Sequence, residues 1–269
     1  MMPLATSSFT MKVDPRIVTS CSQRDCPKTA EAMAHIDVFK ELNPFVYTLK
    51  KDGTLVDNGK LQEEPWVSLM KTAKEKHIRI IPTVMSGDGD TIHALLSNAK
   101  TRQKLEDAIA KEVKTKGYDG IDIDFEAKHA ETKTYFSTFL KGLYMRMGSK
   151  WVQCTIESRT PLDSRCDGTP PADATQYAND YVAINKYCDR VRIMAYDQQT
   201  IDVKLNKDAQ GNPYIPVADP RWVEKVVTLA SQTISKKKIV IGVPTYGYEY
   251  LVTPLTEGYR YDRLWAFNP

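Results

Sequence analysis

The chain has 269 residues, 42% of them hydrophobic, and a formal net charge of +3. This length fits one large α/β domain or two small ones, and the charge is too small to indicate a nucleic-acid partner. No apolar run reaches the roughly eighteen residues of a membrane span, and residues 1–11 lack the basic and apolar regions of a signal peptide.

Short apolar runs alternate with helical patterns along the chain. Predicted strands are 45–49, 78–84, 120–126, 152–157, 191–196 and 239–246. Predicted helices fill the gaps at 64–76, 91–116, 132–147, 174–188 and 220–235. Such alternation indicates βα units and a parallel sheet. No Gly-x-Gly-x-x-Gly follows the first strand, so a dinucleotide fold is not supported, and the regular repeat favours an α/β fold of the (β/α)₈ TIM-barrel type.

The two ends fit this barrel poorly. Residues 16–20 are the sole candidate for its first strand, and residues 1–35 receive no firm assignment. Residues 247–269 contain no apolar run typical of a buried eighth strand. We therefore expect a single domain over 1–269 whose barrel is weak at the first strand and incomplete at the eighth, with 247–269 as the start of an insertion or a truncated end.

Residues 121–126 alternate apolar and acidic side chains. In a strand this pattern places the carboxylates of Asp122, Asp124 and Glu126 on one face, roughly 6–7 Å apart. Each charge raises the cost of ionising its neighbours. Three readings are open from the pattern alone: an antiparallel strand with one wet face, a divalent-metal site, and a catalytic row of carboxylates.

Two motifs carry a resemblance to a known family. Residues 119–126 resemble the Asp-x-x-Asp-x-Asp-x-Glu signature of glycoside hydrolase family 18, which includes chitinases and endo-N-acetylglucosaminidases. Residues 194–197, Met-Ala-Tyr-Asp, resemble the family's Met-x-Tyr-Asp motif on the sixth strand. Residues 85–89 approximate a third motif, Ser-x-Gly-Gly. Segments 43–54 and 242–248 look like the spore-cortex and cell-wall branch.

The resemblance implies substrate-assisted hydrolysis, in which the sugar's own acetamido group attacks the anomeric carbon. It implies that Glu126 is the general acid and then the base, and that Asp124 orients the acetamido N–H. Asp122 is expected to share a proton with Asp124 and to keep the pKa of Glu126 high. Tyr196 would hydrogen-bond the acetamido oxygen, with an ordinary buried tyrosine as the alternative, and Asp197 would bind sugar hydroxyls. No metal or organic cofactor is implied.

Further side chains are expected to contact the glycan. Tyr47 and Tyr246 are predicted to face the barrel mouth and to stack on pyranose rings, while Tyr248 is either a stacking residue or loop packing. Met194 belongs to the second motif. Glu157, at the end of the fifth strand, is a candidate binding residue that points either into the barrel or to solvent.

The predicted partner is a polysaccharide containing N-acetylglucosamine, either chitin or peptidoglycan and cortex glycan. Two alternatives stay open: a non-catalytic carbohydrate-binding protein on the same barrel, and a metal-dependent phosphohydrolase that uses Asp122 and Asp124 as ligands. These polymers lie outside the membrane, so an extracellular or cell-envelope location is expected. The oligomeric state is not predicted.

The five cysteines show no zinc-type pairing. Cys154 lies in a strand pattern and is predicted to be a small buried hydrophobe. The spacing of Cys21 and Cys26 allows a disulfide in an oxidising compartment, so the redox compartment stays open.

Overall fold

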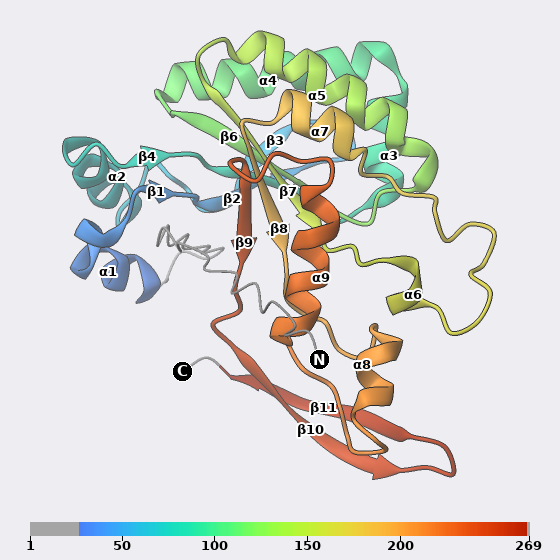
Figure 1. Cartoon of the computed structure of the whole chain (residues 1–269). Coiled ribbons are helices and arrows are strands. Elements are labelled where there is room, and N and C mark those ends of the chain that lie inside the picture. Colours follow the sequence, from blue (N-terminus) through green and yellow to red (C-terminus); the bar gives the residue numbers. More distant parts are fainter. Residues whose placement is uncertain (1–26, 268–269) are drawn as a thin grey trace, which may run out of the picture.

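The computed structural model describes residues 27–267, and Figure 1 shows their arrangement. The main sheet has the strand order β3-β2-β5-β6-β7-β8-β9. β3 pairs antiparallel with β2, and every other pairing is parallel. The strands are β2 (Phe45–Leu49), β3 (Leu55–Asp57), β5 (Thr83–Ser86), β6 (Gly120–Phe125), β7 (Trp151–Glu157), β8 (Arg190–Met194) and β9 (Ile239–Gly242).

The predicted βα repeat is therefore confirmed. Over the described residues the sheet stays open, with β3 and β9 at its edges, in agreement with an incomplete barrel. The candidate first strand at 16–20 lies outside the described residues. The predicted strand 239–246 ends at Gly242.

Prolines interrupt two of the strands. β1 (Glu41–Leu42) is separated from β2 by Pro44, and β4 (Arg79–Ile80) from β5 by Pro82. Proline has no N–H to donate to a ladder. The pairing nevertheless continues through the break, since Thr83 N donates to Pro44 O at 2.8 Å. The predicted strand 78–84 is thus two short strands in line.

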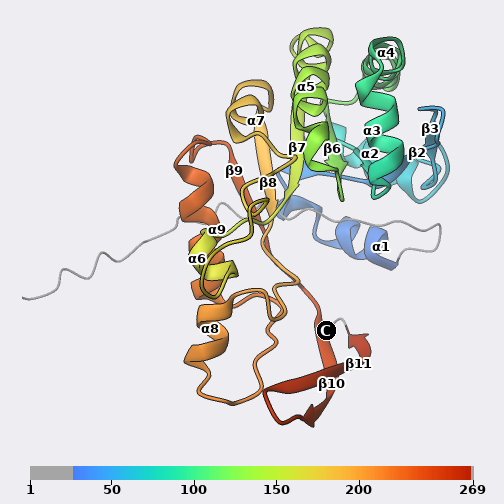
Figure 2. The ribbon, with the colours of Figure 1, turned by 90° about the vertical axis from the view of Figure 1, so that its right-hand side faces the viewer.

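The helices differ from prediction mainly at their ends. Figures 1 and 2 show α4, α5 and α7 together on one side of the sheet. The predicted helix 91–116 is two helices, because the Asn98 side chain accepts hydrogen bonds from the N–H groups of Lys100 and Thr101 and so caps α4. The predicted helix 174–188 begins only at Tyr181. The helices are α1 (Pro27–Ala34), α2 (Trp66–Glu75), α3 (Gly89–Ser97), α4 (Ala99–Lys116), α5 (Lys133–Met147), α6 (Leu162–Arg165), α7 (Tyr181–Tyr187), α8 (Val203–Asp208) and α9 (Pro220–Ser231), with the short 3₁₀ turns η1 (Ile36–Val38) and η2 (Ala130–Thr132).

Residues 247–267 form a hairpin apart from the main sheet. Its strands β10 (Gly247–Pro254) and β11 (Tyr259–Phe267) are antiparallel, and Figure 2 shows them at the end of the molecule away from α4 and α5. Tyr259 Oη donates to Gly211 O at 2.8 Å, and Tyr261 Oη accepts from Tyr214 N at 2.9 Å. The hairpin is therefore anchored to the loop that follows α8.

A disulfide joins Cys154 on β7 to Cys188, which follows α7. Both residues are fully buried. The predicted burial of Cys154 is confirmed, but its interpretation as an unpaired hydrophobic residue is wrong, because the fold brings Cys188 within a Cα–Cα distance of 6.0 Å. Cys21 and Cys26 lie outside the described residues. No helix within 27–267 is long and apolar enough to cross a membrane.

Candidate active site

Strand β6 carries the acidic row from the interior of the sheet to its rim. Asp122 is fully buried, Asp124 is 4% exposed, and Glu126 is half-buried just beyond the strand end. β5 and β7 flank β6 in parallel, so this is not the wet-faced antiparallel strand of the first alternative. Asp119, ahead of the row, accepts a hydrogen bond from Ile80 N at 2.9 Å and has a structural role.

Asp122 is held by hydroxyls and a guanidinium. Its carboxylate accepts from Thr83 Oγ1 at 2.9 Å, from Thr155 Oγ1 at 2.9 Å and from Arg192 Nη1 at 3.2 Å. These partners occupy the oxygens that proton sharing with Asp124 would use. A guanidinium at this distance also repels a cation, which disfavours the metal-dependent alternative.

Asp124 is the most perturbed carboxyl group of the row. Burial, followed by the neighbouring charges of Asp122 and Glu126, raises the pKa of Asp124 to about 8. Its Oδ1 is buried and has no hydrogen-bond partner among the described residues. The raised pKa favours the protonated form of Asp124, and Oδ1 is free to accept a hydrogen bond.

Glu126 lies where the row meets the rim. Burial raises the pKa of Glu126, the charge of Glu157 raises it further, and Lys128 opposes both. The prediction that Asp122 keeps this pKa high is thus replaced: the nearby like charge belongs to Glu157. A half-buried carboxyl with a raised pKa is suited to general acid catalysis.

The second motif lies at the end of β8. Burial and the charge of Asp124 raise the pKa of Tyr196 to about 12. The Tyr196 ring meets that of Tyr246 edge to face, with centroids 6.3 Å apart. Asp197, at φ +55°, accepts a hydrogen bond from Tyr248 Oη at 2.9 Å. The structure thus brings Tyr196, Asp197 and Tyr246 together beside the acidic row.

Space for the Tyr196 ring depends on a glycine. A Cβ added to Gly242, at the end of β9, would lie 2.8 Å from Tyr196 Cε1. Gly242 therefore allows the ring to lie across the strand end. Met194 pairs in register with Gly242 on one side and with Glu157 on the other, and is half-buried.

The prediction that Tyr47 faces the barrel mouth is wrong. Tyr47 is 3% exposed, and its hydroxyl donates to Glu112 Oε1 on α4 at 2.9 Å and lies 3.1 Å from the hydroxyl of Tyr118. The register of β2 against β5 shifts between Phe45 and Tyr47. The contact with Glu112 shows that the Tyr47 side chain points towards α4.

Glu157 has its carboxylate engaged by the protein. Oε1 accepts from Ala127 N at 3.1 Å, and Oε2 accepts from Asn179 Nδ2 at 2.6 Å. Lys128 Nζ lies 3.6 Å from Oε2. These contacts favour a supporting role for Glu157 over direct glycan binding.

Sequence reasoning missed Arg192 and Lys128. Arg192 had a usable signal, because it shares strand parity with Met194 and so faces the same side of the sheet. Lys128 lies two residues after Glu126 in an irregular turn, and no sequence pattern marked it as a site residue.

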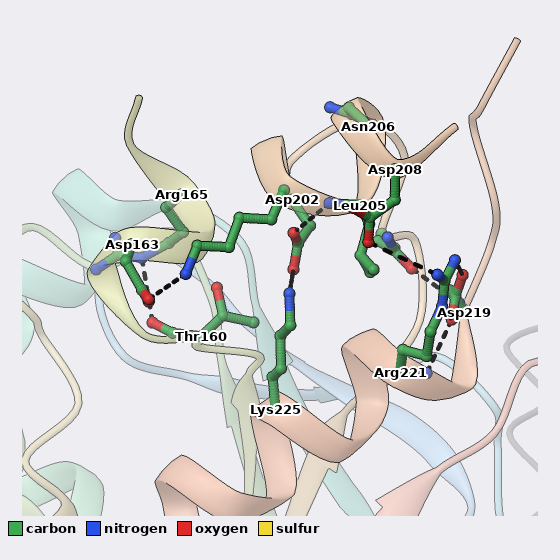
Figure 3. A network of polar contacts seen from close by, with 12 residues as sticks. Thr160, Asp163, Arg165, Asp202, Leu205, Asn206, Asp208, Asp219, Arg221 and Lys225 are labelled. Atoms are coloured by element: carbon green, nitrogen blue, oxygen red, sulfur yellow. Dashed lines mark hydrogen bonds and ion pairs between the residues drawn. The ribbon is translucent and has the colours of Figure 1, made fainter. Parts of the chain in front are cut away.

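Several ion pairs lie in the segments that follow β7 and β8 and at the start of α9. Figure 3 shows Lys225 reaching Asp202 at 2.8 Å and Arg221 reaching Asp219 at 2.7 Å. Lys204 also pairs with Asp163, across the two loops. A cavity of about 650 Å³ beside this network is lined mostly by residues of α8 and α9, together with Pro161 and Gln232, and by none of the predicted site residues.

Comparisons with known proteins find glycosylases similar in sequence and enzymes similar in fold. An uncharacterised glycosylase, YvbX, of Bacillus subtilis is 28% identical over 163 residues, which cover 61% of this chain and 43% of that protein. The spore cortex-lytic enzyme SleL of Bacillus cereus has a TM-score of 0.68 at 18% identity, over 93% of this chain and 55% of that one. A class V chitinase of Pseudomonas fluorescens has a TM-score of 0.74 at 16% identity, over 94% and 82% of the two chains.

The SleL and chitinase structures share the fold of this chain. The chain spans half or less of the length of the curated relatives it matches. The profile described as Glycosyl hydrolases family 18 matches residues 27–266, nearly all of the described part. The chain therefore belongs to glycosyl hydrolase family 18.

Proposed function

We propose that this protein hydrolyses β-1,4 glycosidic links next to N-acetylglucosamine by substrate-assisted, retaining catalysis. Family 18 is an exception to the two-carboxylate rule, because the substrate supplies the nucleophile. The observation that carries the proposal is the acidic row itself, in which the buried Asp124 lies between the guanidinium-paired Asp122 and the rim carboxyl of Glu126.

In the first step Glu126 donates its proton to the leaving glycosidic oxygen. The acetamido oxygen of the bound sugar attacks the anomeric carbon, and the bond to the leaving group breaks. Asp124 accepts a hydrogen bond from the acetamido N–H through Oδ1 and so orients the group and stabilises the oxazolinium-like intermediate, while the Tyr196 hydroxyl hydrogen-bonds the acetamido oxygen. Glu126, now a carboxylate, then takes a proton from the water that opens the intermediate.

Asp197, Tyr246 and Met194 line the sugar position in this proposal. The T-shaped tyrosine pair offers an aromatic face, and Asp197 offers a carboxylate to sugar hydroxyls. An N-acetyl group is required at the cleaved sugar, so cellulose and starch are excluded as substrates.

The matched relatives include chitinases and cortex-lytic enzymes, and both classes of substrate carry the required acetamido group. We therefore propose chitin or peptidoglycan as the polymer, at an extracellular or cell-envelope location. The buried disulfide between Cys154 and Cys188 supports that location, because disulfides persist in oxidising compartments.

The test is hydrolysis of a fluorogenic di-N-acetylchitobioside by the wild type, by Glu126→Gln and by Glu75→Gln, an exposed charge on α2. We expect a loss of about 10²–10⁴-fold in kcat for Glu126→Gln and none for Glu75→Gln. Parallel assays on chitin oligomers and on peptidoglycan fragments separate the two polymers. Sugar binding by a wild type that turns over neither polymer would instead support the non-catalytic alternative.

A further inference from the structure

The residue directly after Glu126 has a strained backbone. Ala127 lies at φ +52°, in the left-handed region that costs a non-glycine residue about 1 kcal/mol or more. Such a conformation persists only where its surroundings impose it. A contact that holds Ala127 therefore also holds Glu126.

Two contacts do so. Ala127 N donates to Glu157 Oε1 at 3.1 Å, so Glu157, at the end of β7, holds the turn from one side. On the other side, a Cβ added to Gly89, the first residue of α3, would lie 2.2 Å from Ala127 O. The Ala127 carbonyl is thus pressed against the start of a helix where only glycine fits.

The next residue in the turn is a buried cation. The Lys128 side chain is 1% exposed, its Nζ lies 3.6 Å from Glu157 Oε2 and 4.9 Å from the centroid of the Phe136 ring, and it donates to the carbonyl of Phe125. Burial of an amine is costly unless it is paired. Glu157 supplies the opposite charge, and Asn179 orients Glu157 by donating to Oε2 at 2.6 Å.

Glu157 and Lys128 act on Glu126 with opposite signs. The negative charge of Glu157 favours the protonated form of Glu126, and the positive charge of Lys128 favours the carboxylate. Among the described residues, Glu126 also interacts with Asp124, near the end of β6, and with Tyr196, just beyond β8. Glu157 and Lys128 thus hold the turn by direct contacts and also influence the charge of Glu126.

We propose that Glu157 and Lys128 are positioning residues that clamp the turn bearing Glu126 and control its protonation through their opposite charges. This assignment rests on the proposed function, in which Glu126 is the acid. It requires neither side chain to touch the glycan.

The experiment is a ¹³C NMR titration of the Glu126 carboxyl, assigned by the signal that disappears in Glu126→Gln. We compare the wild type with Glu157→Gln, Lys128→Met, the double variant and Glu75→Gln. Glu157→Gln should lower the pKa of Glu126, Lys128→Met should raise it, and the double variant should return close to the wild type. Glu75→Gln should match the wild type.

Turnover supplies a second readout. The alkaline limb of the kcat/KM profile should move to lower pH in Glu157→Gln and to higher pH in Lys128→Met. Glu157→Asp retains the charge but shortens the reach to Ala127 N, so it should lower kcat while leaving the titration of Glu126 close to the wild type. This variant and the double variant keep the test usable if a single charge removal prevents folding.

Single variants that shift the titration in the same direction, or that do not differ from Glu75→Gln, would overturn the assignment. A double variant in which the pKa of Glu126 shifts as far as in either single variant would also overturn it. The titration needs no substrate. A chain without turnover would therefore count against the proposed function, while the titration would still decide the role of the pair.

Discussion

Arg192 Nη1 lies 3.2 Å from Asp122 Oδ2, and this contact places a guanidinium beneath the acidic row of β6. The Arg192 side chain is 14% exposed and that of Asp122 is fully buried. The guanidinium offsets the charge of the deepest carboxylate, and Glu126 is the group that gives up and regains a proton in the proposed reaction.

The first prediction concerns the free energy of unfolding. Arg192→Met leaves the Asp122 carboxylate buried without its charged partner, and breaking a buried pair costs about 3–5 kcal/mol. Urea unfolding should show this loss. Arg260→Met is the matched control, because Arg260 pairs with Asp262 at 2.9 Å on an exposed strand. Exposed pairs contribute about 0–1 kcal/mol. Equal losses in the two variants would contradict a structural role for the buried pair.

The second prediction concerns pH. The pKa of Asp124 is raised from 3.8 to about 8, so the folded state binds this proton more tightly than the unfolded state. The resulting stabilisation is full below about pH 4 and is lost as the pH rises towards 8. Relative to Asp124→Asn, the wild type should lose up to about 1.4 kcal/mol of stability per pH unit in this window.

Urea unfolding at about pH 5, 6 and 7 measures this difference. Asp262→Asn, at an exposed strand position, is the control and should follow the wild type at each pH. A constant difference between Asp124→Asn and the wild type across the window would show that Asp124 is already ionised in the folded protein.

The third prediction concerns the space for Tyr196. In Gly242→Ala the added Cβ meets Tyr196 Cε1 at 2.8 Å and Ile193 O at 3.1 Å, so the ring must move. A displacement near 1 Å at a reacting group costs on the order of 10²-fold in rate. kcat/KM on the chitobioside should fall by roughly that factor, while Ile241→Val, a smaller change on the same strand, should leave it near the wild type. Full activity in Gly242→Ala would show that the Tyr196 position is not required.

The fourth prediction concerns the disulfide. The Cys154–Cys188 bond closes a loop with a sequence separation of 34. In the loop-entropy description, its loss costs roughly 3–4 kcal/mol. The double variant Cys154→Ala/Cys188→Ala should lose this amount in urea unfolding, and a reductant should no longer affect its stability. Cys166→Ala, at the free cysteine, is the control. A reductant-insensitive wild type would show that the bond does not form in solution.

Local patterns in the chain were enough to predict the parallel βα order and the acidic row, with Asp122 and Asp124 on β6 and Glu126 just after its end. Both follow from periodicity, because successive strand residues alternate sides and helices fill the gaps between parallel strands. The Met194–Asp197 motif could be recognised in the sequence because its residues are neighbours in the chain.

Contacts between distant segments decided the rest. Tyr47 contacts Glu112 on α4, and Glu157 contacts the turn after β6 and Asn179. Cys154 met Cys188 only through the pairing of β7 with β8. Periodicity determines which face of a strand a side chain occupies, whereas the identity of what lies against that face depends on how the elements pack, and this is the part that the tertiary structure supplied.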